Sequence, residues 1–333
     1  MMERHKSPGV IAASVDLATG SGAEIAFGCN LCGLCTVLCP KGLSPSAMFR
    51  ELRVLAVEKG VADLSPYRGL LAYEDMGRWN LFTLFLPPQK ACNAVFFPGC
   101  ALPGSRPRQT LALFRLLRQI LPGLGAAVSC CFKPSLDLGL VSRFDQRYGH
   151  LKDRLRECGA REVVTACPSC HRVFADLGDF GVKTAWEALA EAGTLEPERL
   201  SARVTIHDPC PLRHEQGVHQ AVRRLAAAAG LSETPMQSRG EHTLCCGQGG
   251  AAHLASPETA GRFTRRRTEE AGKRLILTYC AGCADHLSSH APTVHLLDAL
   301  FPPTAGLRPR RASRVPLASY ANRLRFKRWL ANL

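Results

Sequence analysis

The sequence lacks any apolar run approaching the roughly 18 residues that a helix needs to cross a bilayer. Its first residues, Met1 to Asp16, are mixed and polar, without the apolar stretch of a signal peptide. There is no flavin or nicotinamide fingerprint, and Gly247-Gln248-Gly249-Gly250 lacks the following Lys-Ser/Thr of a phosphate loop. We therefore expect a cytoplasmic protein that depends on another subunit for any flavin or nicotinamide chemistry.

Acidic residues are absent from the last part of the chain, Phe301 to Leu333. The same stretch carries eight basic residues: Arg308, Arg310, Arg311, Arg314, Arg323, Arg325, Lys327 and Arg328. More than half of the net charge of +14 is therefore local, and the body of the chain is only mildly basic. Because nucleic-acid-binding proteins spread their basic residues over a face of the fold, this distribution argues against nucleic acid as a partner.

Cysteine, in contrast, is abundant, with 16 in a chain of 333 residues of which 46% are apolar. This composition excludes disorder, and the length predicts two or three domains. In a small secreted protein so many cysteines would indicate disulfides. Here they occur as C-x2-C and Cys-Cys arrangements without an export signal, which favours metal ligation or redox chemistry.

The first four cysteines form one tight motif. Cys29, Cys32, Cys35 and Cys39 are spaced C-x2-C-x2-C-x3-C and are followed by Pro40, the spacing of a bacterial ferredoxin-type run. The motif predicts a [4Fe–4S] cluster rather than zinc, because zinc sites usually pair two C-x2-C knuckles across a gap. In two-cluster ferredoxins the fourth cysteine binds the other cluster, so the fourth ligand here is either Cys39 or a remote residue such as Cys92.

The remaining cysteines repeat at a nearly constant offset. Each copy has one cysteine, then an adjacent pair, then a C-x2-C, with offsets of 110, 115 and 113 residues between equivalent positions. The first copy contains Cys100, Cys130, Cys131, Cys167 and Cys170, and the second contains Cys210, Cys245, Cys246, Cys280 and Cys283. This pattern indicates a duplicated unit.

Short apolar segments precede the first and last cysteine elements of each copy, at residues 94–97, 163–165, 203–206 and 275–278. Helical patterns lie between them, for example at 110–121 and 221–230. Alternating strands and helices predict an α/β fold with parallel sheets, in which functional groups gather at the carboxyl ends of strands. We expect two duplicated, Rossmann-like α/β units, each with five thiols at one sheet edge, preceded by a small and mainly helical ferredoxin-type domain.

The same observations suggest a domain organisation. We expect an N-terminal tail (1–22), a ferredoxin-type domain (23–62), a linker (63–91), a first cysteine-rich unit (92–200), a second (201–300) and a basic tail (301–333). In the tail, Phe326, Trp329, Leu330 and Leu333 lie on one helical face among basic residues. Such a helix suits the inner surface of a membrane or a membrane subunit, and the alternative is a disordered basic tail.

The order of cysteines resembles that of the cysteine-rich CCG domains of heterodisulfide reductase subunits. The same pair of domains behind a ferredoxin-type domain occurs in iron–sulfur subunits of anaerobic glycerol-3-phosphate dehydrogenase, glycolate oxidase and lactate-utilisation complexes. The resemblance implies that each set of five cysteines holds a further Fe–S cluster, a non-cubane [4Fe–4S] cluster in heterodisulfide reductase. Some related domains bind zinc, so zinc at one of the two sites stays open.

The second copy matches this family pattern better than the first, including its His207-Asp208-Pro209-Cys210 segment. The first copy reads Cys130-Cys131-Phe132 where the family has glycine after the pair. Because only glycine lets the backbone approach a bulky cluster freely, we expect an altered first site or a different metal there. Cys92 is a possible substitute for Cys100. After the second pair, Gly247 to Gly250 either direct backbone N–H groups at cluster sulfurs or form a plain turn.

The sequence as a whole predicts an iron–sulfur electron-transfer subunit of an oxidoreductase complex. The resemblance implies a flavoprotein or dehydrogenase partner and a quinone or disulfide acceptor. An alternative is a disulfide reductase that acts at the second CCG cluster, and a non-enzymatic alternative is a zinc-stabilised scaffold. His171 and His207 lie beside predicted ligands and could modulate the clusters.

Overall fold

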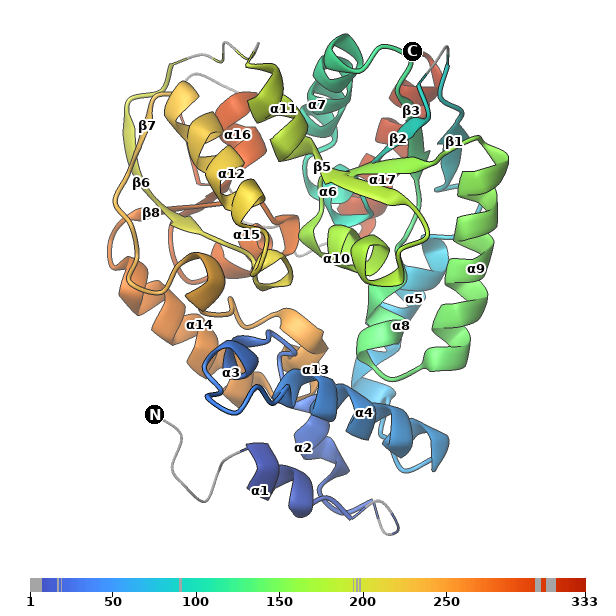
Figure 1. Cartoon of the computed structure of the whole chain (residues 1–333), viewed down its shortest axis with the longest axis vertical. Helices are drawn as coiled ribbons and strands as arrows, with labels where there is room; N and C mark the ends of the chain where they lie inside the picture. Colours follow the sequence, from blue (N-terminus) through green and yellow to red (C-terminus); the bar gives the residue numbers. More distant parts are fainter. Residues whose placement is uncertain are drawn as a thin grey trace.

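In a computed structural model of the chain, short parallel strands alternate with helices in two halves, which confirms the predicted α/β class (Figure 1). The structure describes residues 8–302, except 17, 19, 90, 91, 194, 196 and 198, and residues 307–309 and 316–333. Within these ranges, no helix is both long enough and apolar enough to cross a membrane. Arg310, Arg311 and Arg314 of the basic tail lie outside the described residues.

The first half is built on a five-stranded sheet of order β1-β3-β2-β4-β5, in which all strands except β1 run parallel. Its strands are β1 (Leu84–Leu86), β2 (Ala94–Phe97), β3 (Gly125–Val128), β4 (Glu162–Thr165) and β5 (Gly181–Thr184). The helices of this half are α6 (Ala101–Ser105), α7 (Pro107–Ile120), α8 (Lys133–Asp137), α9 (Val141–Glu157), α10 (Pro168–Leu177) and α11 (Ala185–Ala192). Strands β2 and β3 are buried throughout, as expected of a parallel sheet covered on both faces.

The second half contains a four-stranded, fully parallel sheet of order β7-β6-β8-β9. Its strands are β6 (Ala202–His207), β7 (Leu231–Glu233), β8 (Leu275–Thr278) and β9 (Thr293–His295). The helices are α12 (Gln216–Ala228), α13 (Ala252–Ala255), α14 (Pro257–Ala271), α15 (Ala281–Leu287) and α16 (Leu296–Leu300), with single turns η3 (Cys210–Leu212), η4 (Gly240–His242) and η5 (Gly249–Ala251).

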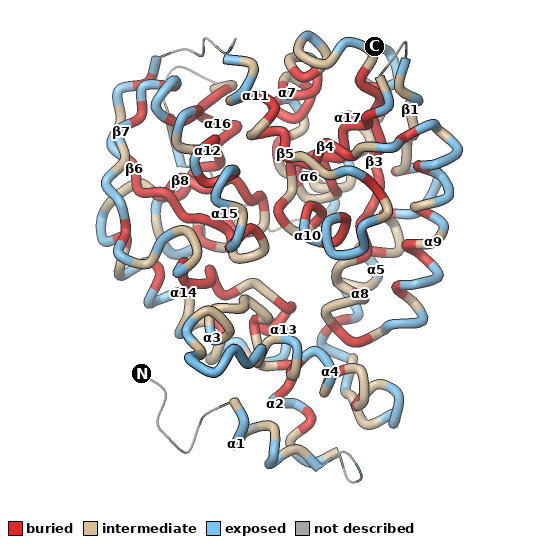
Figure 2. The backbone as a smooth tube through the Cα atoms, in the orientation of Figure 1, coloured by how far each residue is buried: buried red, intermediate tan, exposed pale blue. Residues whose placement is uncertain are grey.

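One apolar core joins the two halves. It contains Phe114 of α7 and Trp186 of α11 from the first half together with Leu225 of α12 and Leu296 of α16 from the second. These helices lie between the two sheets, and their buried faces are drawn in red in Figure 2. The two halves are therefore packed as one body rather than connected by a flexible hinge.

The N-terminal segment lies across the base of both halves (Figure 1). It consists of α1 (Pro8–Ala13), α2 (Ala23–Phe27), α3 (Leu34–Val37) and α4 (Pro45–Glu58). The segment that we expected to be a linker, 63–91, is more than a connection. It contains a turn η2 (Ser65–Tyr67), helix α5 (Arg68–Met76) and strand β1, which extends the first sheet by antiparallel pairing with β3.

The C-terminal helix α17 (Pro316–Ala331) forms as the sequence predicts, but its apolar stripe faces inward. Phe326 and Leu330 are fully buried in the core that joins the two halves, and Trp329 packs against the same core. The helix contacts α6 and α7, while Arg325, Arg328 and Leu333 stay exposed. Most of the apolar face that we assigned to a membrane surface is therefore covered by the chain itself, which removes these side chains from water.

Candidate metal centres

The cysteines of both repeats stand at the carboxyl ends of parallel strands. Cys100 follows β2 and Cys167 follows β4, whose last residues are paired in register. In the same way, Cys210 follows β6 and Cys280 follows β8. Parallel pairing brings the ends of neighbouring strands to one sheet edge, so residues that are about 70 positions apart in sequence meet there.

The five cysteines of the second repeat gather into one cluster. The thiol of Cys245 interacts with those of Cys210 and Cys246, and the thiol of Cys246 interacts with that of Cys283. Cys283 also contacts Cys280, whose sulfur lies 3.5 Å from the Cys283 backbone nitrogen. All are buried except the half-buried Cys210. The interaction with Cys245 holds the pKa of Cys246 well below its ordinary value, which favours the thiolate that a metal requires.

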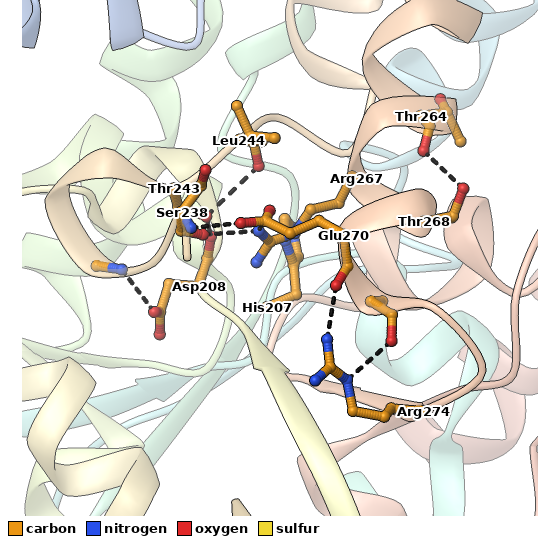
Figure 3. Close-up of polar contacts among 12 residues, drawn as sticks. His207, Asp208, Ser238, Thr243, Leu244, Thr264, Arg267, Thr268, Glu270 and Arg274 are labelled. Atoms are coloured by element: carbon orange, nitrogen blue, oxygen red, sulfur yellow. Dashed lines mark hydrogen bonds and ion pairs between the residues drawn. The ribbon is translucent and has the colours of Figure 1, made fainter. Parts of the chain in front are cut away.

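His207, the last residue of β6, directs its Nε2 toward this cluster. Nε2 and the sulfurs of Cys246 and Cys283 lie within 4.8 Å of one another. The second ring nitrogen, Nδ1, accepts a hydrogen bond of 2.9 Å from Nε of the buried Arg267 (Figure 3). Arginine has only donors, so Nδ1 carries no proton and the ring proton is on Nε2. In this tautomer the N–H at Nε2 lies on the side of the sulfurs and has no hydrogen-bond partner among the described residues.

Asp208 connects the three segments that carry the cysteines of the second repeat. Its buried carboxylate accepts two hydrogen bonds of 3.0 Å from Arg223 and one of 3.1 Å from the Tyr279 hydroxyl. The backbone N–H of Gly240 donates to the same carboxylate at 2.8 Å, and the Thr243 hydroxyl donates to the Asp208 carbonyl at 2.8 Å. Figure 3 shows Asp208 beside Thr243 and the loop that leads to the cysteine pair. Asp208 therefore fixes the relative positions of all three cysteine elements.

The cysteines of the first repeat form two groups of interacting thiols. The thiol of Cys100 interacts with that of Cys130, and this interaction is the main reason why the pKa of Cys100 falls to about 6. The thiol of Cys170 interacts with those of Cys131 and Cys167. The two groups are continuous through the adjacent residues Cys130 and Cys131, so the first repeat also brings five thiols to one sheet edge. Cys130, Cys131 and Cys170 are buried.

The residue after each cysteine pair has the same backbone role in both repeats, although Phe132 replaces glycine in the first. Phe132 adopts a left-handed φ of 57°, and Gly247 has a φ of 102°. The N–H of Phe132 donates to Cys130 Sγ at 3.4 Å, and that of Gly247 donates to Cys245 Sγ at 3.3 Å. The phenyl ring is buried in the core, which offsets the cost of a left-handed non-glycine residue. The expected disturbance of the first site is therefore absent from this backbone segment.

The ferredoxin-type run docks directly onto the second cysteine set. The thiol of Cys32 lies against that of Cys245, and this interaction lowers the pKa of Cys32 to about 6. Arg213, fully buried beside the second set, donates to the Cys32 carbonyl at 3.0 and 3.1 Å. Asn30 is also buried. With its side-chain amide assigned in the orientation that satisfies its hydrogen bonds, the amide nitrogen donates to the carbonyls of Gly247 and Gly249 at 3.0 and 3.3 Å.

This docking gives a reason for the glycines after the second pair. A Cβ atom on Gly249 would lie 2.4 Å from the Asn30 carbonyl oxygen, and one on Gly250 would lie 2.8 Å from the Cys29 carbonyl oxygen. Any side chain would therefore push the N-terminal run away. The two interpretations that we offered for Gly247 to Gly250, a sulfur-binding loop and a plain turn, both omitted this contact, because nothing in the local sequence names its distant partner.

Arg53 of α4 also binds the N-terminal segment to the rest of the chain. Its fully buried guanidinium donates to the carbonyl oxygens of Ala26, Phe27 and Cys29 in the N-terminal segment. It also donates at 2.8 Å to the Gly250 carbonyl of the second half and, in the first half, to the Asp137 carbonyl. One side chain thus joins three parts of the chain. Sequence reasoning missed it, since an arginine within an amphipathic helix usually faces solvent.

Two alternatives of the sequence analysis concern Cys92, and the structure contradicts both. Cys92 precedes β2, so the strand Ala94–Phe97 separates it from Cys100 at the cysteine-bearing edge. Its sulfur instead faces the Ala94 carbonyl oxygen at 3.9 Å. Cys92 therefore neither replaces Cys100 nor reaches the N-terminal run. Cys39, the other candidate for fourth ligand, follows α3 within that run.

The donor set indicates which metal group these sites fit. Thiolates are soft ligands that suit zinc or iron–sulfur clusters. Zinc takes four ligands in a closed tetrahedral site, whereas five thiols converge at the second site. The N–H of His207 aims at sulfur rather than offering a lone pair, and hydrogen bonds to sulfur are typical of cluster environments. The residues present therefore fit an iron–sulfur cluster.

Fold and site together define a cysteine-rich, metal-binding α/β protein with two equivalent thiol sets at strand ends. A family model described as a cysteine-rich domain, CCG, matches the chain twice, over residues 94–175 and 204–288. The chain belongs to this CCG family, as its cysteine spacing predicts. Each match contains all five cysteines of one repeat.

Several curated relatives are subunits of oxidoreductases. The chain is 27% identical to a subunit of the fumarate reductase (CoM/CoB) of Methanothermobacter marburgensis, over 81% of this chain and 58% of that one. It is 26% identical to a subunit of the dihydromethanophenazine:CoB–CoM heterodisulfide reductase of Methanosarcina mazei, over 80% of this chain and 70% of that one. It is also 26% identical to the glycolate oxidase iron-sulfur subunit of Escherichia coli, over 60% and 55%. The chain thus spans between 55% and 70% of the length of these relatives.

Proposed function

We propose that this chain is an iron–sulfur electron-transfer subunit of an oxidoreductase complex. The observation that carries the proposal is the contact between the thiol of Cys32, in the ferredoxin-type run, and that of Cys245, in the second cysteine set. Electron transfer between two centres requires that they lie close together in a water-excluded environment. The clamp made by Arg53, Asn30 and Arg213 holds these two cysteine sets in contact.

In this proposal, residues 23–62 act as the ferredoxin-type unit and the two CCG domains hold one or two further clusters. The ligands are Cys29, Cys32, Cys35 and Cys39 in the first unit and the two sets of five cysteines described above. Bound Fe–S clusters supply one-electron redox chemistry. The chain's own residues position the thiolates, donate backbone N–H groups to sulfur from Phe132 and Gly247, and bury most of the cysteines of the two CCG sets.

The partner that we propose is a flavoprotein or dehydrogenase subunit, with a disulfide or quinone as the acceptor. The relatives' names support a place in a complex of several subunits. We expect the protein in the cytoplasm or at the inner face of the membrane. Any membrane contact would use the exposed basic residues of α17, such as Arg325 and Arg328, because its apolar stripe is covered.

The test is anaerobic purification of the full chain, with iron and acid-labile sulfide counting and low-temperature EPR. We expect a brown protein with iron and sulfide in near-equal amounts. Cys245→Ser should remove only the second-set signal, and Cys131→Ser only the first-set signal. Magnetic coupling between the N-terminal cluster and the second-set cluster should broaden the N-terminal EPR signal. This broadening should disappear in Cys245→Ser. A colourless protein that contains zinc and no sulfide would contradict this proposal and support the zinc-stabilised scaffold instead.

The alternative function, a disulfide reductase at the second site, requires a substrate sulfur to reach the cluster. Cys245, Cys246, Cys280 and Cys283 are each at most 8% exposed, and the docked N-terminal run covers Cys245. The name of the heterodisulfide reductase relative is the observation in its favour. The test is whether the reduced, purified chain cleaves a small disulfide without a partner protein. Such cleavage would support the disulfide reductase over the electron-transfer subunit.

A further inference from the structure

A buried guanidinium lies beside the first cysteine set without a hydrogen-bonding partner. Arg323 of α17 is fully buried, and none of its three nitrogens meets an acceptor among the residues that the structure describes. The guanidinium carries five N–H donors and stays charged at any physiological pH. Burial of an unpaired charge is strongly unfavourable, so its persistence in this place indicates a negative group that the protein atoms do not supply.

Two aromatic rings hold Arg323 in a fixed position. Its guanidinium carbon lies 5.3 Å from the centroid of the Tyr73 ring and 5.2 Å from that of Phe82. These cation–π contacts stabilise the charge from two sides but leave the N–H groups unbonded. Tyr73 also donates its hydroxyl to the Cys100 carbonyl at 3.3 Å, so the same ring connects the arginine to the backbone of the first set.

The guanidinium is directed toward the first cysteine set by Gly77. A Cβ atom on Gly77 would lie 2.7 Å from Cβ of Cys130 and 3.6 Å from Nη2 of Arg323. The absence of a side chain at Gly77 leaves room for both the Arg323 guanidinium and the Cys130 side chain. The positive charge of Arg323 also favours the thiolate of Cys100, in addition to the larger effect of Cys130.

A buried carboxylate close to the first set is already neutralised. Glu74, the residue after Tyr73 and close enough to influence Cys100 and Cys130, is bonded to Arg147 at 2.8 Å and to the Ser135 backbone N–H at 2.8 Å. It therefore does not pair with Arg323.

Two hydrogen bonds hold the helix that carries Arg323 in place. Asn322 donates to the Gly104 carbonyl at 2.9 Å, and Ser319 is bonded to the Tyr73 hydroxyl at 3.2 Å. The first contact anchors α17 against α6, the helix that begins directly after Cys100, and the second anchors it against α5. The C-terminal helix thus completes the wall of the first site, as the N-terminal run completes that of the second.

We propose that Arg323 is a positioning residue for an anionic iron–sulfur cluster at the first set, with its N–H groups donated to the sulfurs around Cys100 and Cys130. The inference rests on the proposed function, because it requires a cluster at this site. Each reduction adds one electron and therefore one negative charge to the site. A fixed cation in a dry environment favours the reduced state, so Arg323 raises the reduction potential of the first cluster relative to a neutral residue.

The experiment uses the full-length holoprotein, purified anaerobically, in a redox titration followed by EPR. Cys131→Ser first identifies the iron and the signal that belong to the first set. If this variant has the same iron content as the wild type, the first set holds no cluster, and the proposed function fails there independently of Arg323. With the signal assigned, Arg323→Gln removes the charge and Arg323→Lys retains it. Arg328→Gln is the matched control, since it removes an exposed charge from the same helix.

We expect Arg323→Gln to lower the reduction equilibrium constant of the first-set signal at least tenfold, which is about 59 mV for one electron. Arg323→Lys should retain most of the wild-type potential, and Arg328→Gln should leave it unchanged because solvent screens its charge. Loss of first-set iron in Arg323→Gln but not in Arg323→Lys would also support the inference, because it would show that the first cluster requires a positive charge at this position. An unchanged potential in Arg323→Gln, or equal loss of iron in the folded Gln and Lys variants, would overturn the inference.

Discussion

At the residue scale, the second site depends on two polar residues that hold cysteines without contacting a metal. His207 is the last residue of β6, and Asp208 follows it directly. Both side chains are fully buried, and both are held by arginines, Arg267 and Arg223. In the first repeat the equivalent positions are Phe97 and Pro98, so this polar support belongs to the second site alone.

Asp208→Asn should destabilise the protein by about 2 kcal/mol, because the buried carboxylate loses its charged hydrogen bonds with Arg223, which keeps only its ion pair with Glu233. Denaturant unfolding of the anaerobic holoprotein measures this effect. Asp176→Asn is the matched control, since its ion pair with Arg172 is 45–46% exposed and should contribute less than about 1 kcal/mol. Equal stability of the two variants would show that Asp208 does not tie the cysteine segments together.

At the element scale, single side chains decide where the terminal elements lie. The N-terminal helices α2–α4 are attached to both halves through the carbonyl acceptors of Arg53, and α17 is attached through its own apolar stripe. Helix formation in both regions follows from local sequence. The faces that these helices bury follow from partners in the two halves that are more than 80 residues away in the chain.

Arg53→Lys should loosen the N-terminal segment while the sheets stay intact. Lysine has three donors in place of five, so at least two of the five carbonyl groups would lose their bond in a buried site, each at about 1–3 kcal/mol. Hydrogen exchange should rise over residues 23–39 and 247–250 in particular. Arg50→Lys, on the exposed face of the same helix, is the control. Unchanged protection of residues 23–39 would contradict the proposed clamp.

At the scale of the whole molecule, the three cysteine sets lie where parts of the chain meet. The second set lies between the second half and the N-terminal run, and the first set lies between the first half, α5 and α17. Bound metal would therefore crosslink segments that the backbone leaves far apart. Ligand binding of this kind contributes directly to the free energy of folding.

Removal of iron by a chelator under anaerobic, reducing conditions should lower the melting temperature of the full chain by at least about 5 °C. The loss of stability should be largest at the loop 240–250 and in α17, because these segments border the sites. Calorimetry of the loaded and stripped protein measures the shift. Identical melting temperatures would mean that the cysteine sets are preformed and that metal adds nothing to the fold.

Much of the fold and of the ligand set follows from short-range pattern. The C-x2-C and Cys-Cys spacings, repeated behind four β-rich segments, predicted two α/β units with thiols at the strand ends, and the observed strands β2, β4, β6 and β8 lie at these segments. The role of Cys92 could not be predicted this way, because proximity in sequence to Cys100 hides the strand that separates them. The same limit applies to Phe132, where the tertiary core stabilises a backbone conformation that its residue type disfavours.

The amino-acid sequence by itself determined the family, the α/β class and the thiol chemistry, because these depend on residue types at fixed local spacing. Only the tertiary structure decided that Cys32 lies against Cys245, that the apolar stripe of α17 faces inward and that Arg323 is buried beside Cys100. These features depend on contacts between distant segments, and the free energy of such contacts is set by which surfaces can be buried together rather than by any local pattern.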